Sequence, residues 1–207
     1  IEPRWFRLWC LSLVLMRCQP LRRALGLKGK SMHSDDLFKD QAKTISSIVL
    51  AAETEDELGT VLRIHGVLEE LLDVFLSSKT QGDVAKIVKI PRDFGAKLSL
   101  STAFGLPLSQ ALVIHQFNVI RNKLAHAKSQ SINKGDLIQL ARLTESIASN
   151  DAEFTPIKSR YIEFPSKNPG QKLAFGEHGN RIDFVITFFV FYSFLEKWLK
   201  EHVEESA

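Results

Sequence analysis

The chain has 207 residues, of which 44% are hydrophobic and 25% charged, enough for one globular domain with a substantial core. Residues 1–31 hold seven Lys/Arg against one Glu and contribute +6 to a formal net charge of +3, so the remaining residues carry −3. A mildly acidic body argues against a uniformly basic nucleic-acid-binding domain.

Residues 1–31 differ in composition from the rest of the chain. They contain both cysteines, Cys10 and Cys18, and two of the three tryptophans. Their apolar run over 8–16 is far shorter than the roughly 20 residues needed to span a bilayer, and no small-residue cleavage site follows it. We expect 1–31 to be a non-native or dispensable extension, with a membrane-surface anchor as the alternative. Without these cysteines the domain has neither disulfides nor thiolate ligands, so a reducing, cytoplasmic setting is expected.

Apolar residues at helical spacing predict a series of helices in the single domain 32–207. Thr54 with Glu57 forms a capping-box pattern, Asp93 and Asn133 are N-cap candidates, and Pro107 suits the first turn of a helix. Residues 83–92 fit either a short helix or a strand. The predicted helices cover residues 34–52, 54–78, 94–104, 108–127 and 136–148.

The pattern changes after residue 150. Two alternating segments, 160–164 and 172–175, flank Asn168-Pro169-Gly170 and predict a small β-hairpin. A last helix over 182–203 is apolar on nearly every face, which is typical of a buried core helix or a dimer interface. Because one bundle was not expected to cover all of it, we predict a homodimer through this helix, the 108–127 helix or both. The fold class is all-α: a bundle of five to six helices with the hairpin before the last one.

A polar stripe runs along the predicted 108–127 helix. At 100° per residue, His115, Asn122 and His126 fall within about 40° of one another, whereas Arg121 points to the other flank. Such a stripe among apolar neighbours either satisfies a buried network or faces a site.

The segment Arg121-Asn122-Lys123-Leu124-Ala125-His126 resembles the signature of the HEPN superfamily, an arginine and a histidine separated by four residues. The wider stretches GAKLSLSTAFGL at 95–106 and ALVIHQFNVIRNKLAH at 111–126 are similar to mannitol-repressor-like helical regulators. The first resemblance implies a dimeric helical bundle and a metal-independent endoribonuclease of toxin–antitoxin or antiviral systems, with an antitoxin as partner. The second implies a non-catalytic transcriptional regulator that acts through protein partners.

The chemistry of such a site follows from its residue types. Cleaving RNA without a metal needs a group that moves the proton of the 2′-hydroxyl, and a histidine titrates in the right range. Arg121 offers a fork of donors matched to phosphate, and Asn122 can orient His126 across one helical turn. One set supplies a single titrating group, and a symmetric dimer supplies the second. Arg121, Asn122 and His126 are therefore the predicted catalytic residues.

A structural role is the competing interpretation. Arg121 can pair with Glu69, Glu70 or Asp73 on the preceding long helix, and His126 can cap carbonyls at the helix end. We expect His65 and His115 to be core or interface histidines. His65 and Glu69 share a face, but no third ligand has suitable spacing, so neither a metal nor a cofactor is predicted.

Overall fold

The computed structural model describes residues 46, 48–50, 52–53, 56–126, 131–148, 154–164, 167 and 169–204. The chain divides into two compact units, Ile1–Lys43 and Thr44–Ala207, and every described residue belongs to the second. The predicted extension 1–31 and most of the predicted 34–52 helix therefore lie outside the described residues. The few positions described between 46 and 53 are helical, as expected.

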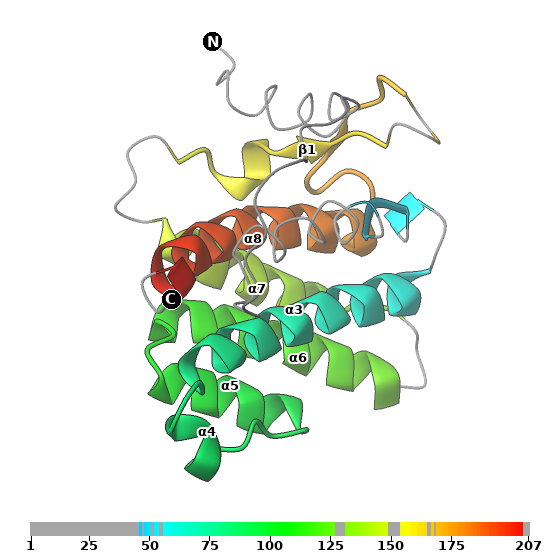
Figure 1. Ribbon diagram of the computed structural model, residues 1–207. Coiled ribbons are helices and arrows are strands. Elements are labelled where there is room, and N and C mark those ends of the chain that lie inside the picture. The colour runs from blue at the N-terminus through cyan, green and yellow to red at the C-terminus, as the bar shows by residue number, and fades with distance from the viewer. Residues whose placement is uncertain are drawn as a thin grey trace, which may run out of the picture. The chain divides into compact units, whose positions relative to one another are not determined.

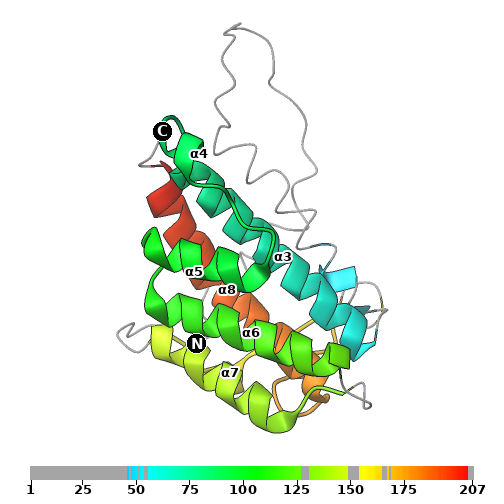
Figure 2. The ribbon, with the colours of Figure 1, turned by 90° about the horizontal axis from the view of Figure 1, so that it is seen from below.

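Four long helices pack in a closed ring, as Figures 1 and 2 show. They are α3 (Glu57–Lys79), α6 (Leu108–His126), α7 (Lys134–Ile147) and α8 (Asn180–Glu204). Helix α3 packs on α6 and α8, and α7 completes the ring by packing on the same two helices. Helix α5 (Phe94–Ala103) lies against α3 and α6, so this side of the bundle has a three-helix junction.

Two short elements complete the described part. Residues 83–92, which fitted either a helix or a strand, contain the four-residue helix α4 (Val84–Ile87). Before α8, a 3-10 turn η1 (Ile157–Ser159) leads into the antiparallel strands β1 (Tyr161–Ile162) and β2 (Leu173–Ala174), with Tyr161 opposite Ala174. The predicted all-α bundle with a small hairpin is confirmed.

Local capping explains where several helices begin and end. Asp93 and Asn133 are the N-caps of α5 and α7, as predicted, and their side chains accept backbone N–H bonds. Helix α5 ends in a Schellman turn, because Leu106 N donates to the Ser101 carbonyl and Gly105 adopts φ 106°. This turn directs the chain into α6, and the Pro107 carbonyl accepts the Ala111 N–H bond.

The predicted Thr54–Glu57 capping box is wrong. Glu57 is the first residue of α3, and Asp56 is its N-cap, accepting from Gly59 N at 2.8 Å. The Glu57 carboxylate instead accepts the backbone N–H of Ile132, on the segment that precedes α7. Asp56 therefore caps the helix in the way predicted for Thr54, and Glu57 joins the start of α3 to the segment before α7.

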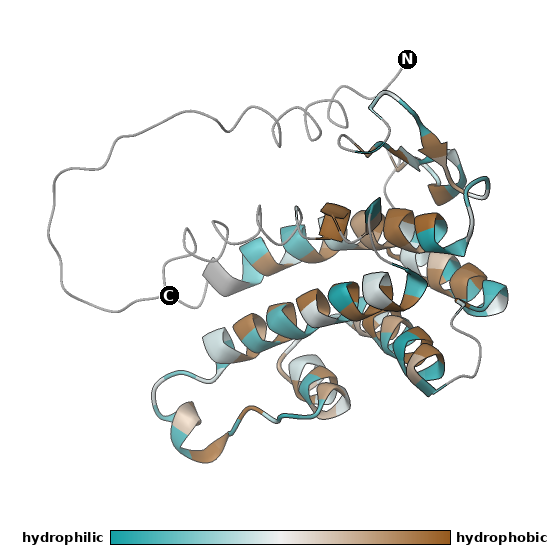
Figure 3. Ribbon diagram, turned by 90° about the vertical axis from the view of Figure 1, so that its right-hand side faces the viewer, coloured by the Kyte–Doolittle hydropathy of each residue, from teal (hydrophilic) through white to brown (hydrophobic). Residues whose placement is uncertain are grey.

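Much of helix α8 is buried within one chain, but Phe189 and Phe194 are only half-buried, so the expectation that one bundle does not cover every face of α8 stays open. Phe184, Phe188 and Phe191 are all fully buried. Their rings surround Phe117 of α6 at centroid distances of 5.2, 5.9 and 5.9 Å. The first half of α8 is drawn mainly in brown in Figure 3, in keeping with its place in the core. Among the described residues, no helix combines the length and apolar character that a membrane crossing needs.

Candidate functional site

The three predicted site residues lie in the last two turns of α6. Arg121 and Asn122 are half-buried, whereas His126 is exposed at the final helical position. Arg121 Nη1 donates to Asn122 Oδ1 at 2.9 Å, which draws the guanidinium toward the helix face that carries Asn122. His126 follows Asn122 by four residues and so lies on that same face. Asn122 therefore bonds the Arg121 guanidinium and lies on the face of α6 that carries His126.

Arg121 has no counter-ion among the described residues. Its contact with Asn122 is neutral, and its Nε atom is buried with no hydrogen-bond partner. The alternative that Arg121 pairs with Glu69, Glu70 or Asp73 is wrong. A buried donor without a partner costs about 1–3 kcal/mol, so this is an unfavourable arrangement for a purely structural arginine. The arrangement suits an arginine that receives an anion from outside the fold.

Lys97 of α5 takes the carboxylates that were candidate partners of Arg121. Its Nζ atom lies 2.8 Å from Glu69 Oε1 and 2.8 Å from Asp73 Oδ2, both on α3. The Lys97 side chain is buried, with 7% of the residue exposed. Burial alone would lower the pKa of Lys97, but the hydrogen bonds to Asp73 and Glu69 outweigh it and raise the pKa. The sequence offered no signal for this choice, because Lys97 belongs to a short helix between the two long ones.

His65 of α3 lies beside the same cluster. It is 8% exposed, its ring packs on Phe94 of α5 at a centroid distance of 4.1 Å, and its Nε2 atom lies 3.1 Å from Asn118 Oδ1 of α6. Burial lowers the pKa of His65 and the positive charge of Arg121 lowers it further, while the bond to Asn118 and the charge of Glu69 oppose the shift. Neutral His65 therefore donates Nε2–H to Asn118. The predicted place of His65 in the core is confirmed, but no signal in the sequence indicated its bond to Asn118.

The solvent side of α6 carries a line of residues that we call the α6 stripe: Leu108, Leu112, His115, Val119, Asn122 and His126. Their alternating spacing of four and three residues places them along one side of a helix. Leu108 is 66% exposed and Leu112 is 44% exposed, and both histidines are exposed. Of the two expected places for His115, core or interface, the core is therefore excluded, and an interface stays a prediction.

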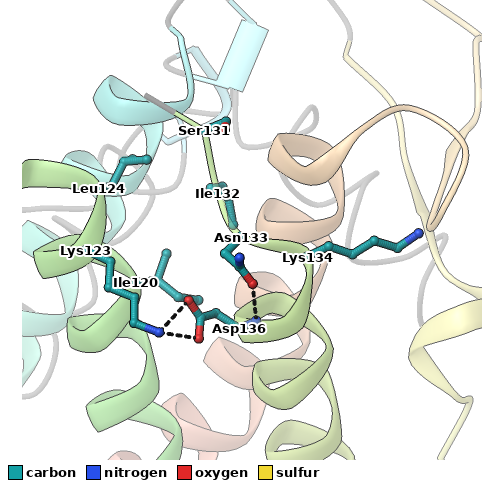
Figure 4. A pocket seen from close by; sticks show the side chains of 8 residues that line it. All are labelled: Ile120, Lys123, Leu124, Ser131, Ile132, Asn133, Lys134 and Asp136. Atoms are coloured by element: carbon teal, nitrogen blue, oxygen red, sulfur yellow. Dashed lines mark hydrogen bonds and ion pairs between the residues drawn. The ribbon is translucent and has the colours of Figure 1, made fainter. Parts of the chain in front are cut away.

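A cavity of about 410 Å³ lies between the end of α6 and the start of α7, and it includes none of the three predicted residues. Figure 4 shows Lys123 reaching Asp136 across it, at 2.7 and 2.9 Å, while Lys134 points away from this pair. Asn133 accepts from the first amides of α7, so its side-chain oxygen is occupied as well. In the described part of the chain, no three His, Cys, Asp or Glu residues are grouped so as to hold a metal ion.

Comparison with protein-family models, curated proteins and solved structures finds no match for this chain. The assignment of a function therefore depends on the residues of the site themselves.

Proposed function

We propose that the chain is a HEPN-like, metal-independent endoribonuclease that acts on RNA through Arg121, Asn122 and His126. The observation that carries the proposal is the half-buried Arg121 guanidinium, which has a neutral partner in Asn122 and, among the residues that the structure describes, no carboxylate. A phosphate supplies the missing negative charge, and its oxygens accept in the geometry that a guanidinium offers.

Each residue has a distinct part in the proposed reaction. Arg121 binds the scissile phosphate and stabilises the charge that builds on its oxygens in the transition state. His126 is exposed and moves the proton of the attacking 2′-hydroxyl. Asn122 holds the guanidinium at 2.9 Å and lies one turn before His126, so it fixes the two groups relative to each other. The products are a 2′,3′-cyclic phosphate and a free 5′-hydroxyl.

A second proton-transfer group comes, in this proposal, from a second copy of the chain. The α6 stripe supports a two-fold dimer, because exposed Leu108 and Leu112 provide apolar contact on the side that carries Asn122 and His126. Most apolar residues of helix α8 are buried, whereas Leu108 and Leu112 of α6 are exposed, so α6 is the better of the two interfaces considered. Pairing two stripes brings two copies of His126 to one composite site.

The alternative is a non-catalytic, mannitol-repressor-like regulator that acts through a protein partner. The exposed leucines of the stripe support this alternative as well as they support the dimer, since they can contact a partner protein as readily as a second copy of the chain. In that case Arg121 binds a carboxylate of the partner, and the chain has no hydrolytic activity.

The test compares the wild type with His126→Ala on mixed RNA in EDTA. We expect the wild type to cleave RNA but not DNA, which lacks the 2′-hydroxyl, and the variant to lose cleavage with an unchanged melting temperature. His178→Ala, which removes an exposed histidine outside α6, is the matched control and keeps full activity. A dimeric wild-type protein free of bound inhibitor that leaves RNA intact contradicts the nuclease and favours the regulator.

A further inference from the structure

At the junction of α3, α5 and α6, Lys97 pairs with two carboxylates of α3, whereas Arg121 lies one turn after Asn118, the α6 residue that bonds His65 of α3. Lys97 binds both Glu69 and Asp73 at 2.8 Å, and Arg121 binds neither. We propose that Lys97 is a positioning residue that keeps these carboxylates away from Arg121, so that the guanidinium remains available to an external anion. This inference rests on the proposed function of Arg121 and concerns the regulation of that same site.

One side-chain contact and two helical spacings connect Glu69 to Arg121. Glu69 lies one helical turn after His65 on the same face of α3. His65 Nε2 lies 3.1 Å from Asn118 Oδ1, and Asn118 precedes Arg121 by three residues on α6. The charges of Glu69 and Arg121 both act on the pKa of His65, in opposite directions, which is consistent with both side chains lying near it.

The balance of charge at the junction depends on Lys97. Helix α3 presents Glu69 and Asp73, α5 presents Lys97, and α6 presents Arg121, so the four charges cancel. The Glu69 and Asp73 side chains are 35% and 42% exposed, whereas that of Lys97 is 8% exposed. Removing the buried Lys97 charge leaves two partly solvated carboxylates without their cation, and the charges of Glu69 and Arg121 both act on the pKa of the same His65. An arginine fork binds a carboxylate in two places, so Arg121 then has an internal partner that competes with phosphate.

A purely structural salt bridge makes a different prediction. If Lys97 only attaches α5 to α3, its loss lowers stability and creates no new interaction between Arg121 and Glu69. The two interpretations therefore differ in the coupling between these residues, and this coupling can be measured without any RNA.

The experiment is a double-mutant cycle of Arg121→Gln and Glu69→Gln, measured by thermal unfolding at low salt in the wild type and in Lys97→Met. We expect additive shifts in the wild-type background. In the Lys97→Met background we expect a favourable coupling that appears as a non-additive shift of about 2–4 °C. Lys89→Met is the matched control background, because Lys89 is exposed and its Nζ atom donates to the Ala85 carbonyl. If Lys97→Met does not fold, Lys97→Gln keeps a donor while removing the charge. Coupling that is equal in the two backgrounds overturns the inference.

A second measurement links the coupling to RNA. Lys97→Met is expected to weaken binding of a short RNA oligonucleotide about tenfold, equivalent to about 1.4 kcal/mol. Adding Glu69→Gln is expected to restore the affinity, which a merely destabilised protein does not do. If the wild type binds no RNA, the proposed function fails, while the unfolding cycle still decides the role of Lys97.

Discussion

His65 Nε2 lies 3.1 Å from Asn118 Oδ1, so a side-chain hydrogen bond joins α3 to α6 three residues before Arg121. The bond needs His65 as a donor at Nε2, and the Phe94 ring at 4.1 Å leaves one face of the imidazole in an apolar contact. A protonated His65 places a second positive charge near Arg121, for which the described part of the chain supplies no counter-ion. The protonation state of His65 therefore affects both the packing of the two helices and the arginine.

The first prediction concerns the pH dependence of stability. The pKa of His65 is lowered in the folded protein, chiefly by burial, so the unfolded chain binds this proton more readily. Unfolding free energy is therefore fully retained above the unfolded pKa of about 6.5 and falls as the pH drops through the lower folded value. His65→Gln keeps a donor for Asn118 without titrating, and we expect it to flatten this slope in chemical denaturation between pH 7 and pH 5. His178→Gln is the control, and an equal flattening there contradicts the assignment.

The second prediction concerns Arg121 itself. Because its Nε atom is buried without a partner, Arg121→Met is expected to leave the free protein equally stable or more stable by about 1 kcal/mol. Inorganic phosphate or a short RNA should raise the melting temperature of the wild type but not of the variant. A loss of more than about 1 kcal/mol in Arg121→Met would indicate a structural arginine.

The third prediction concerns the α6 stripe. We expect the wild type to sediment as a dimer at tens of micromolar concentration. Leu112→Glu is expected to shift it to a monomer, because it places charge in the proposed apolar contact. Ile138→Glu, which changes an exposed apolar residue on α7, should leave the dimer intact. Monomeric wild-type protein removes the composite site.

The fourth prediction concerns the core. Phe117 contacts three rings of α8, so Phe117→Ala leaves a cavity at the centre of the bundle and is expected to cost about 3–5 kcal/mol of unfolding free energy. Ile87→Ala on α4, where Ile87 is 87% exposed, should change stability by less than about 0.5 kcal/mol. Urea denaturation of the two variants measures their unfolding free energies. A small loss of unfolding free energy in Phe117→Ala would be inconsistent with the packing described.

Local signals in the sequence predicted the helices well, because capping and periodicity act over a few residues. Asp93 and Asn133 begin their helices as expected. The start of α3 was misplaced because Thr54 and Asp56 are both acceptable N-cap residue types, and Glu57 bonds Ile132, 75 residues later, instead of completing a capping box. The sequence was also ambiguous about what covers helix α8. Its apolar residues indicate burial, but the sequence does not say whether the cover comes from the same chain.

The predicted site was only partly recoverable from the sequence. The helical spacing placed Asn122 and His126 on one face, but it could not decide the partner of Arg121. That outcome depends on Lys97, which reaches the α3 carboxylates from a separate helix. The His65–Asn118 bond spans 53 residues of sequence and was equally inaccessible to pattern analysis.

Ile132 is held at both of its backbone polar groups by side chains from other parts of the bundle. Its N–H donates to the Glu57 carboxylate of α3, and its carbonyl accepts from Asn180 Nδ2 of α8 at 2.8 Å. The amide proton of Ile132 can exchange with solvent only after the Glu57 bond opens. Ile132 follows His126 by six residues in the sequence. Hydrogen exchange at its amide therefore reports how often the segment before α7 separates from the start of α3.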